Sequence, residues 1–313
     1  MSPLRAFGRL CYLGQWFFRA RFLGRTAPLQ TVLFVSDACN LACKHCNILK
    51  RDGSGPVSKS YRQITVELEY AYGLGSRFVD FSGGEPFIWR DEAEGVRDIN
   101  DLIRQARAIG FFSATVTTNG QQPLADCAAD SLWVSLDGVG EAHDQIRGPG
   151  TFRRLLENIE ASHKSGGHKH LSVNMVINSL NRGSVRDTVE FAAAHPAIKS
   201  ISLNFHTPFP GTEELLLPPE ERRAVVDELI LLKRAGLPVM NSVSGLKAMR
   251  ELNFKARCWI SNFIMADGAR LEECPGRRAG LCGQCGFCMA GEMASLFAMK
   301  PDTILGGLNL RVK

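Results

Sequence analysis

The sequence lacks the features that mark membrane-spanning and secreted proteins. Its 313 residues contain no run of eighteen apolar residues, so we expect no transmembrane helix. We recognise no cleavable secretory signal, and the ten cysteines are not distributed as in a small disulfide-stabilised protein. Cys11 and Cys127 stand apart as ordinary thiols, whereas the other eight form two tight clusters. This pattern predicts metal ligation in a reducing environment, and therefore a cytoplasmic globular protein.

Acidic residues are absent from residues 1–36, where five arginines lie among large apolar side chains. Those arginines equal the net charge of +5, so the rest of the chain is neutral. Phe7, Leu10, Leu13 and Phe17 recur at roughly helical spacing, which predicts a basic amphipathic helix. Such a helix fits an anionic membrane surface, and it also fits docking on its own domain or a dimer interface. We expect no nucleic-acid partner, because the basic residues form no broad positive face.

Short apolar runs alternate with helix-like stretches after residue 30. The runs predict strands at residues 31–36, 78–81, 115–118, 132–136, 171–177 and 200–204. The stretches predict helices near residues 61–73, 99–109, 152–163, 186–194 and 218–237. This alternation predicts an α/β fold with a parallel sheet and helical crossovers. An open doubly wound sheet and a curved partial barrel both satisfy it.

Three cysteines, Cys39, Cys43 and Cys46, lie within eight residues directly after the first predicted strand. They are one thiolate short of saturating a four-iron cluster, and an iron without a protein ligand can bind a substrate. A zinc site would need a fourth protein ligand, for which only His45 is close. The spacing therefore indicates iron–sulfur chemistry.

Polar, glycine-rich residues follow the second predicted strand, and in such folds ligands bind at the carboxyl ends of strands. Gly83 and Gly84 would let a ligand approach the backbone closely. The carboxylate of Glu85 could accept a hydrogen bond from a cationic amino group. The alternative interpretation is that Gly83 and Gly84 form an ordinary turn and that Glu85 is an exposed loop acid.

Later strands end in similar residues. Residues 117–120 follow the third strand, Ser135 and Asp137 at the end of the fourth could bind ribose hydroxyls, and Asn204 ends the sixth. Asn174 places a polar amide on a buried strand, where it must find partners. Taken singly, each has an ordinary structural explanation, but their recurrence on one rim indicates a ligand site.

These motifs together resemble the radical S-adenosylmethionine (radical SAM) superfamily over about residues 31–210. The first cysteines match its CxxxCxxC triad, and residues 82–86 resemble its GGEP element, which in that family binds the methionine amine. The resemblance implies an α/β fold, a partial (β/α)6 TIM-like barrel with a small C-terminal extension. It also implies S-adenosylmethionine and a [4Fe-4S] cluster bound by three cysteines. The implied cofactor-binding residues are Gly83, Gly84, Glu85, Pro86, Thr118, Asn119, Ser135, Asp137 and Asn174.

The same resemblance implies an enzyme with a defined chemistry. In the family, an electron passed into the sulfonium of S-adenosylmethionine breaks the C5′–S bond. The 5′-deoxyadenosyl radical then abstracts hydrogen from a substrate or adds to a double bond. The electron would come from a donor such as flavodoxin or ferredoxin.

A second cysteine group near the carboxyl terminus resembles the SPASM and twitch extensions of the superfamily, which carry auxiliary [4Fe-4S] clusters. Its members are Cys258, Cys274, Cys282, Cys285 and Cys288. The run 267–271 resembles the β-hairpin of those extensions, although the spacing after Gly268 differs from theirs. Five thiols allow at most one further complete cluster. A structural zinc site is the alternative.

The predicted divisions are a leader at residues 1–30, a radical SAM core at 31–237 and an extension at 238–313. This arrangement more loosely resembles the adenosyl-transferring enzymes of hopanoid lipid biosynthesis. That resemblance implies a lipid or isoprenoid substrate and a peripheral position on the inner membrane face. Other small molecules and ribosomal peptides remain alternatives, although thirty leader residues are too few for a winged peptide-recognition domain. A non-catalytic iron–sulfur electron carrier is the alternative from another class.

Overall fold

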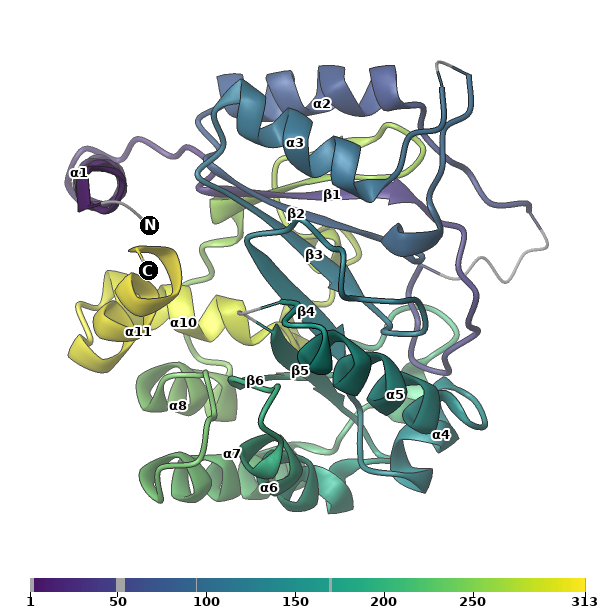
Figure 1. Ribbon diagram of the computed structural model, residues 1–313. Helices are drawn as coiled ribbons and strands as arrows, with labels where there is room; N and C mark the ends of the chain where they lie inside the picture. Colours follow the sequence, from purple (N-terminus) through teal and green to yellow (C-terminus); the bar gives the residue numbers. More distant parts are fainter. Residues whose placement is uncertain (1–2, 49–53, 94, 169–170, 313) are drawn as a thin grey trace.

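The computed structural model describes residues 3–48, 54–93, 95–168 and 171–312 (Figure 1). Its sheet has eight strands in the order β6-β5-β4-β3-β2-β1-β7-β8. The strands are β1 (Gln30–Ser36), β2 (Phe78–Gly83), β3 (Ser113–Thr118), β4 (Ser131–Ser135), β5 (Leu171–Ile177), β6 (Ile201–Phe205), β7 (Ser261–Ile264) and β8 (Arg270–Leu271). All neighbouring strands are parallel except β7 and β8, which form an antiparallel hairpin.

Helices connect the parallel strands and cover the outer face of the sheet (Figure 1). The α-helices of the described residues are α1 (Pro3–Phe22), α2 (Tyr61–Gly73), α3 (Ile99–Ile109), α4 (Glu141–Arg147), α5 (Thr151–Lys164), α6 (Val185–Ala194), α7 (Pro219–Arg234), α8 (Val243–Glu251), α9 (Pro275–Arg278), α10 (Cys288–Phe297) and α11 (Pro301–Val312). Helices α2 to α8 lie between parallel strands, whereas α1 precedes β1 and α9 to α11 follow β8. Strands β1 to β6 follow one another in chain order without a reversal. A doubly wound sheet reverses its strand order, so the partial (β/α)6 barrel is confirmed and the doubly wound alternative is wrong.

The boundaries of α2 and α3 follow from capping residues in the sequence. Ser60 accepts a hydrogen bond from the backbone of Gln63, whose side chain accepts one from Ser60 in return. Asp98 and Asp101 form the same reciprocal pair at the start of α3, and Gly110 ends that helix in the left-handed conformation. Both predicted helices are confirmed at their predicted residues, because capping boxes and a terminal glycine define helix ends locally.

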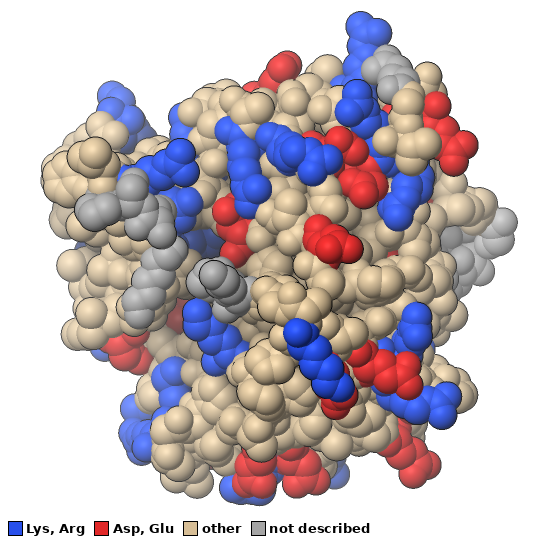
Figure 2. All heavy atoms as spheres, in the orientation of Figure 1, with Lys and Arg blue, Asp and Glu red and all other residues tan. Residues whose placement is uncertain are grey.

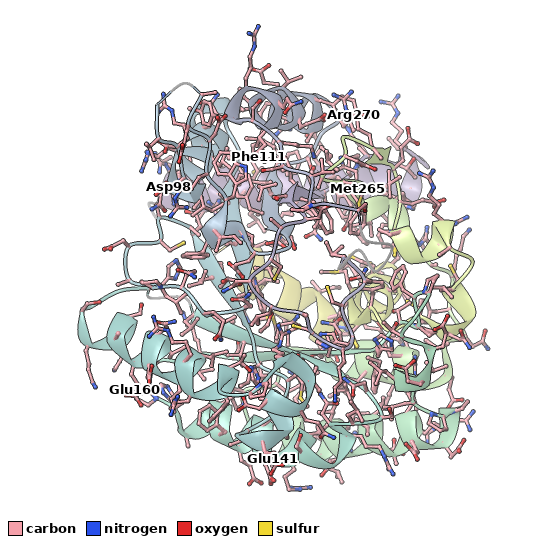
Figure 3. All side chains as sticks on the ribbon, turned by 90° about the vertical axis from the view of Figure 1, so that its right-hand side faces the viewer. Asp98, Phe111, Glu141, Glu160, Met265 and Arg270 are labelled. Atoms are coloured by element: carbon pink, nitrogen blue, oxygen red, sulfur yellow. The ribbon has the colours of Figure 1, made fainter. Side chains whose placement is uncertain are left out.

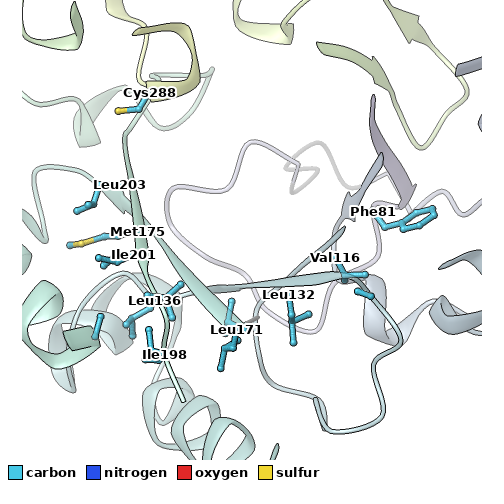
Figure 4. Close-up of a cluster of buried hydrophobic side chains, with 14 of the residues drawn as sticks. Phe81, Val116, Leu132, Leu136, Leu171, Met175, Ile198, Ile201, Leu203 and Cys288 are labelled. Atoms are coloured by element: carbon cyan, nitrogen blue, oxygen red, sulfur yellow. The ribbon is translucent and has the colours of Figure 1, made fainter. Parts of the chain in front are cut away.

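The two faces of the sheet differ in character. Residues that point outward, such as Phe81, Val116 and Leu203, are fully buried against the helices in one hydrophobic core (Figure 4). Residues that alternate with them point into the barrel, and many of these are polar. Because successive side chains of a strand point to opposite faces, burial of the apolar residues against the helices turns the alternate, often polar, residues toward the barrel interior.

Helix α1 is docked on its own domain, as one of the predicted alternatives had it. Trp16 and Ala20 are buried in a second apolar cluster with Phe78 and Phe297, and the Trp16 indole donates to the carbonyl of Ala27 at 2.9 Å. The amino and carboxyl termini lie on the same side of the molecule, beside α11 (Figure 1). Among the described residues, no helix combines the length and apolar character needed to cross a membrane.

Candidate cofactor site

The three-cysteine loop follows β1 and lies where the strands end, on the side that faces the viewer in Figure 3. Cys39 is exposed, Cys43 is buried and Cys46 is intermediate. The pKa of Cys43 is raised to about 11, chiefly by burial, with Cys46 and Cys39 adding to the increase and Arg147 opposing it. The three sulfur atoms therefore lie close enough to interact electrostatically, as ligands of one cluster must.

Two glycines bring β2 against this loop. A Cβ on Gly83 would lie 2.1 Å from the carbonyl oxygen of Ser36, and one on Gly84 would lie 1.9 Å from that of Ala38. The Gly84 and Glu85 amides donate to the same two carbonyls, each at 2.8 Å. These glycines therefore allow the backbone after β2 to pack closely against the cysteine loop.

Glu85 is buried and ties three segments together. Its carboxylate accepts hydrogen bonds from the Phe87 amide at 3.0 Å, the Thr118 hydroxyl at 2.7 Å and the Asn119 amide at 2.7 Å. Burial raises its pKa, and the three hydrogen bonds oppose that shift. Pro86 directly follows and begins a short 3₁₀ turn. Because the β3 residues donate to Glu85, the carboxyl ends of β2 and β3 are held together.

Asn119 extends this connection to the cysteines. Its side-chain amide donates to Asn40 Oδ1 at 2.8 Å and lies 3.8 Å from Cys39 Sγ. The predicted residues Thr118 and Asn119 therefore meet both the Gly-Gly-Glu segment and the triad loop. A hydrogen bond to a ligating sulfur is one of the means by which a protein tunes an iron–sulfur cluster.

Asp137 is fully buried and already engaged by protein groups. Arg147 Nε donates to its Oδ2 at 2.6 Å, His45 Nε2 lies 3.6 Å from the same oxygen, and the Val176 amide donates to Oδ1 at 2.8 Å. Burial alone would raise the pKa of Asp137, but the Arg147 guanidinium holds it below its usual value. Its predicted contact with ribose stays a prediction.

Sequence reasoning missed Arg147, which no motif marks. It lies at the end of α4, a seven-residue helix, and its Nη1 is 3.8 Å from Cys43 Sγ. A cation beside a sulfur ligand stabilises the thiolate that metal binding requires. The signal available in the sequence was only an arginine ten residues after Asp137, which is too general to indicate a site.

Ser135 and Asn174 lie side by side inside the barrel. They are register partners on β4 and β5, and Asn174 Oδ1 accepts a hydrogen bond from Asn204 Nδ2 at 2.9 Å. The strand ends thus bring together the predicted rim residues of β4, β5 and β6. Within the described residues, the buried atoms His45 Nδ1 and His143 Nε2 have no hydrogen-bond partner, which leaves polar groups of this rim available to a bound group.

The second cysteine group lies between the two ends of the open sheet. Cys258 precedes β7, while the loop carrying Cys274 and Cys285 packs beside β6: Gly276 faces Thr207, and a Cβ on Gly286 would be 1.9 Å from the Phe205 carbonyl. The predicted hairpin is confirmed as β7 and β8, and Figure 3 labels Met265 and Arg270 on it. Arg270 pairs with Glu67 of α2 at 2.7 Å, which fixes the hairpin to the barrel.

Cys258 interacts electrostatically with Cys274, Cys282 and Cys285, whereas Cys288 interacts with Cys285 alone among these thiols. The pKa of Cys258 is raised to about 12, chiefly by burial, with Cys274, Cys285 and Cys282 adding to the increase. Cys288 is buried in the hydrophobic core at the start of α10. No three His, Cys, Asp or Glu side chains of the described residues are held at metal-binding distances, so we expect the thiolates of both groups to draw together on metal binding.

A thiol-rich loop held across the carboxyl ends of a partial α/β barrel defines a cofactor-dependent enzyme with an iron–sulfur centre. The chain belongs to the Radical SAM superfamily, whose model matches residues 33–192. The predicted radical SAM enzyme, with its [4Fe-4S] cluster and S-adenosylmethionine, is thereby confirmed, and the C-terminal cysteines fit an auxiliary cluster. The alternative of a non-catalytic electron carrier is wrong.

Curated relatives match part of the chain. Mycofactocin maturase MftC of Mycobacterium ulcerans is 29% identical over 191 residues, 57% of this chain and 48% of that protein. A probable GTP 3′,8-cyclase of Sulfolobus acidocaldarius is 25% identical over 167 residues, 51% of this chain and 50% of that protein. The AdoMet-dependent heme synthase of Oleidesulfovibrio alaskensis is 24% identical over 273 residues, covering 81% of this chain and 65% of that protein. The chain thus spans about half the length of several curated relatives that it matches.

Solved structures share the fold. SuiB of Streptococcus suis bound to S-adenosylmethionine has a TM-score of 0.62 at 18% identity, covering 80% of this chain and 61% of that chain. The enzyme anSMEcpe with bound AdoMet and Kp18Cys peptide has a TM-score of 0.57 at 15% identity, covering 91% of this chain and 84% of that chain.

Proposed function

We propose that this enzyme cleaves S-adenosylmethionine reductively at a cluster held by Cys39, Cys43 and Cys46, and modifies an amphiphilic lipid at an anionic membrane surface. The cluster supplies the electron for that cleavage, which a donor such as flavodoxin or ferredoxin would replenish. The observation that carries the membrane part is the outer face of α1. The radical part rests on membership of the superfamily and on the linked rim described above.

Residues of the rim have distinct proposed roles toward the cofactor. The backbone of residues 83–86 would receive the methionine amine, with Glu85 as the nearby negative charge. Ser135 and Asp137 would receive the ribose, and Asn174 the methionine carboxylate. Thr118 and Asn119 hold the rim against the cysteine loop through the contacts already described.

The outer face of α1 presents large apolar side chains to solvent. Leu4 is 85% exposed, Phe7 65%, Phe18 54% and Phe22 60%. At 100° per residue these four share one stripe, on the side opposite the buried Trp16. Monomeric proteins rarely leave such a stripe uncovered, and each large apolar side chain gains roughly 1.5–3 kcal/mol when fully buried.

Arginines on the same helix favour a negatively charged partner for this apolar stripe. Arg19, Arg21 and Arg25 lie on or just after the same helix, and residues 1–36 contain no acid. Each basic residue near an anionic lipid surface contributes about 1 kcal/mol to binding. Charge and apolar exposure together therefore favour an anionic membrane, with the helix lying in the headgroup layer.

We also propose that Cys258, Cys274, Cys282 and Cys285 hold the auxiliary cluster. These four thiols influence one another electrostatically, and they come from both sides of the open end of the barrel. Cys288 has a structural position instead: its amide donates to Asn204 Oδ1 at 2.9 Å, and its side chain joins the core.

A peptide substrate is the second candidate, favoured by the structural neighbours. One SuiB structure is bound to its precursor peptide SuiA, and its fold covers 83% of this chain with a TM-score of 0.61. At 17% identity this likeness concerns the fold, so the peptide reading depends on a direct test.

The test uses anaerobically reconstituted, reduced enzyme with S-adenosylmethionine and either lipid or peptide extracts. We expect 5′-deoxyadenosine or an adenosylated product to form with the lipid extract, and co-sedimentation with phosphatidylglycerol vesicles. Phe18→Ser with Phe22→Ser should abolish co-sedimentation. Leu231→Ser is the matched control, because Leu231 is 62% exposed on α7. Product with peptides alone, or vesicle binding unchanged by the double substitution, would overturn the lipid assignment.

A further inference from the structure

A cavity of about 1140 Å³, partly open to solvent at the strand starts, lies on the inner face of the sheet. In closed (β/α)8 barrels, layers of Val, Ile and Leu side chains fill this space. Here the inward positions of the strands include Asp80, Thr115, Thr117, Ser172 and Ser202, all of which line the cavity. A partly open space with polar walls can hold a polar ligand, and we refer to it as the chamber.

The chamber connects two regions of the molecule. Asn174, at the proposed cofactor rim, lines one part of it, and Arg5 and Arg9 of α1 line another. On β3 the lining runs from Ser113 to Thr117, which at the usual rise per residue is about 13 Å. A molecule in the chamber can therefore reach the cofactor rim while its other end lies near α1.

Cations from several elements surround the end of the chamber near the strand starts. They are Arg5 and Arg9 of α1, Arg107 of α3, Lys199 before β6, Lys233 of α7 and Arg311 of α11. The acids among the described lining residues are Asp80 and Asp130. Figure 2 shows basic side chains beside α1 on the left of this face. The wall of the chamber thus carries an excess of positive charge.

Three of these cations donate to neutral oxygens. Arg9 donates to the Phe112 carbonyl, Arg311 to Gln30 Oε1, and Lys233 to the Val239 carbonyl at 2.6 Å. Arg107 instead pairs with Asp130 at 3.1 Å. These three hydrogen bonds go to uncharged acceptors, and the carboxylates that act on the same cations are Asp130 for Arg9, Asp80 for Arg311, and Glu292 and Asp302 for Lys233.

The titration behaviour of the lining agrees with this distribution. Desolvation lowers the pKa of Arg311 to about 10, which leaves it charged near neutrality, and it also lowers the pKa values of Arg9 and Lys233. Burial raises the pKa of Asp80 to about 7, although the Thr117 hydroxyl opposes the shift. Asp80 therefore supplies only part of a negative charge where the cations are concentrated.

We propose that this chamber binds the anionic group of the substrate, a phosphate or carboxylate, between Arg311, Lys233 and Arg9. This inference rests on the proposed function and adds the chemistry of the substrate: an anionic group held toward the strand starts, away from the cofactor rim. Trp133, Met240 and Met289 line the same cavity and would contact an apolar portion. Either a lipid headgroup or a free phosphate ester has this chemistry.

The experiment uses the full-length protein with reconstituted clusters and inorganic pyrophosphate as the probe, titrated calorimetrically. We expect Arg311→Gln or Lys233→Gln to weaken binding at least about tenfold, as loss of one charged hydrogen bond does. Arg154→Gln is the control, because Arg154 is 55% exposed on α5, and it should change binding less than about twofold. Arg311→Lys should keep most of the affinity.

The outcomes separate the chamber from the proposed function. No pyrophosphate binding by the wild type, or equal binding by all variants, would overturn the chamber. 5′-Deoxyadenosine is measured on the same samples after addition of reductant, S-adenosylmethionine and the lipid extract: its absence alongside binding that depends on Arg311 would overturn the proposed function and leave the chamber intact. A lipid source predicts that phosphatidic acid vesicles displace pyrophosphate, and a free source predicts displacement by glycerol 3-phosphate. Displacement by neither would overturn the anionic-substrate proposal.

Discussion

Arg147 connects Asp137 to Cys43: its Nε is 2.6 Å from the Asp137 carboxylate and its Nη1 is 3.8 Å from the Cys43 sulfur. All three side chains are buried. The carboxylate of Asp137, which follows β4, therefore orients the guanidinium of Arg147 toward Cys43, a predicted cluster ligand in the loop after β1. The connection gives this buried ion pair a role in the site as well as in the fold.

Replacing Arg147 by Met should destabilise the protein and weaken cluster binding. Removing one partner of a buried pair leaves the Asp137 charge uncompensated, which costs about 3–5 kcal/mol. Urea unfolding of the metal-free protein and iron content after reconstitution measure the two effects. Adding Asp137→Asn should restore much of the stability but not the iron content. Full iron content in the single variant would contradict the role of Arg147 beside Cys43.

Gly84→Ala should reduce iron binding at the triad. The new Cβ would lie 1.9 Å from the Ala38 carbonyl, so the cysteine loop must move away from β2. Gly183→Ala is a matched control, because no described heavy atom lies within 4 Å of its Cβ position. Iron analysis and the visible absorption of the reconstituted proteins report the difference. Equal iron in both variants would show that this close approach is dispensable.

Cys288→Ala should retain the auxiliary cluster, and Cys274→Ala should lose it. Cys274 interacts with Cys282, whereas Cys288 lies in the hydrophobic core. Each variant is combined with Ala at the three triad cysteines, so that iron per chain reports the second site alone. Loss of iron in the Cys288 variant, with Cys274→Ala unaffected, would show that Cys288 and not Cys274 is the cluster ligand.

Asp80 should make the protein less stable as pH rises. Its pKa is raised from 3.8 to about 7, so the folded state holds a proton that the unfolded state has released. Stability is therefore lost across the window from about pH 4 to pH 7, by at most about 1.4 kcal/mol per pH unit. Asp80→Asn should be less sensitive to pH than the wild type in urea unfolding at pH 5 and pH 8. Parallel profiles for the two proteins would refute the assignment.

Local sequence signals explain why some elements were predicted well. Helix α2 begins after Ser60 and α3 begins after Asp98, and in both cases the capping partner lies three residues further on. The strands were placed within about two residues, because their outward positions form an apolar period of two. Information of this kind resides within a few neighbouring residues, so it can be read before the fold is known.

Other parts depend on contacts between distant residues. Strand β7 pairs with β1, and Gln30 Nε2 donates to Ser261 Oγ at 2.8 Å across 231 positions. The short helix α4 with Arg147 carries no periodic pattern of its own, and helices α8, α10 and α11 were not predicted. The sequence brought the five distal cysteines into one group but could not show that Cys288 faces the core, because that depends on where β6 ends.

The position of α1 has a consequence for how the molecule meets its two reaction partners. The helix lies at the starts of the strands, whereas the triad loop lies at their ends, so the barrel separates them (Figure 1). If the helix rests on a bilayer, the opposite pole faces the aqueous phase, where a protein reductant can dock. Lipid and electrons would then arrive from opposite poles and would not compete for the same surface.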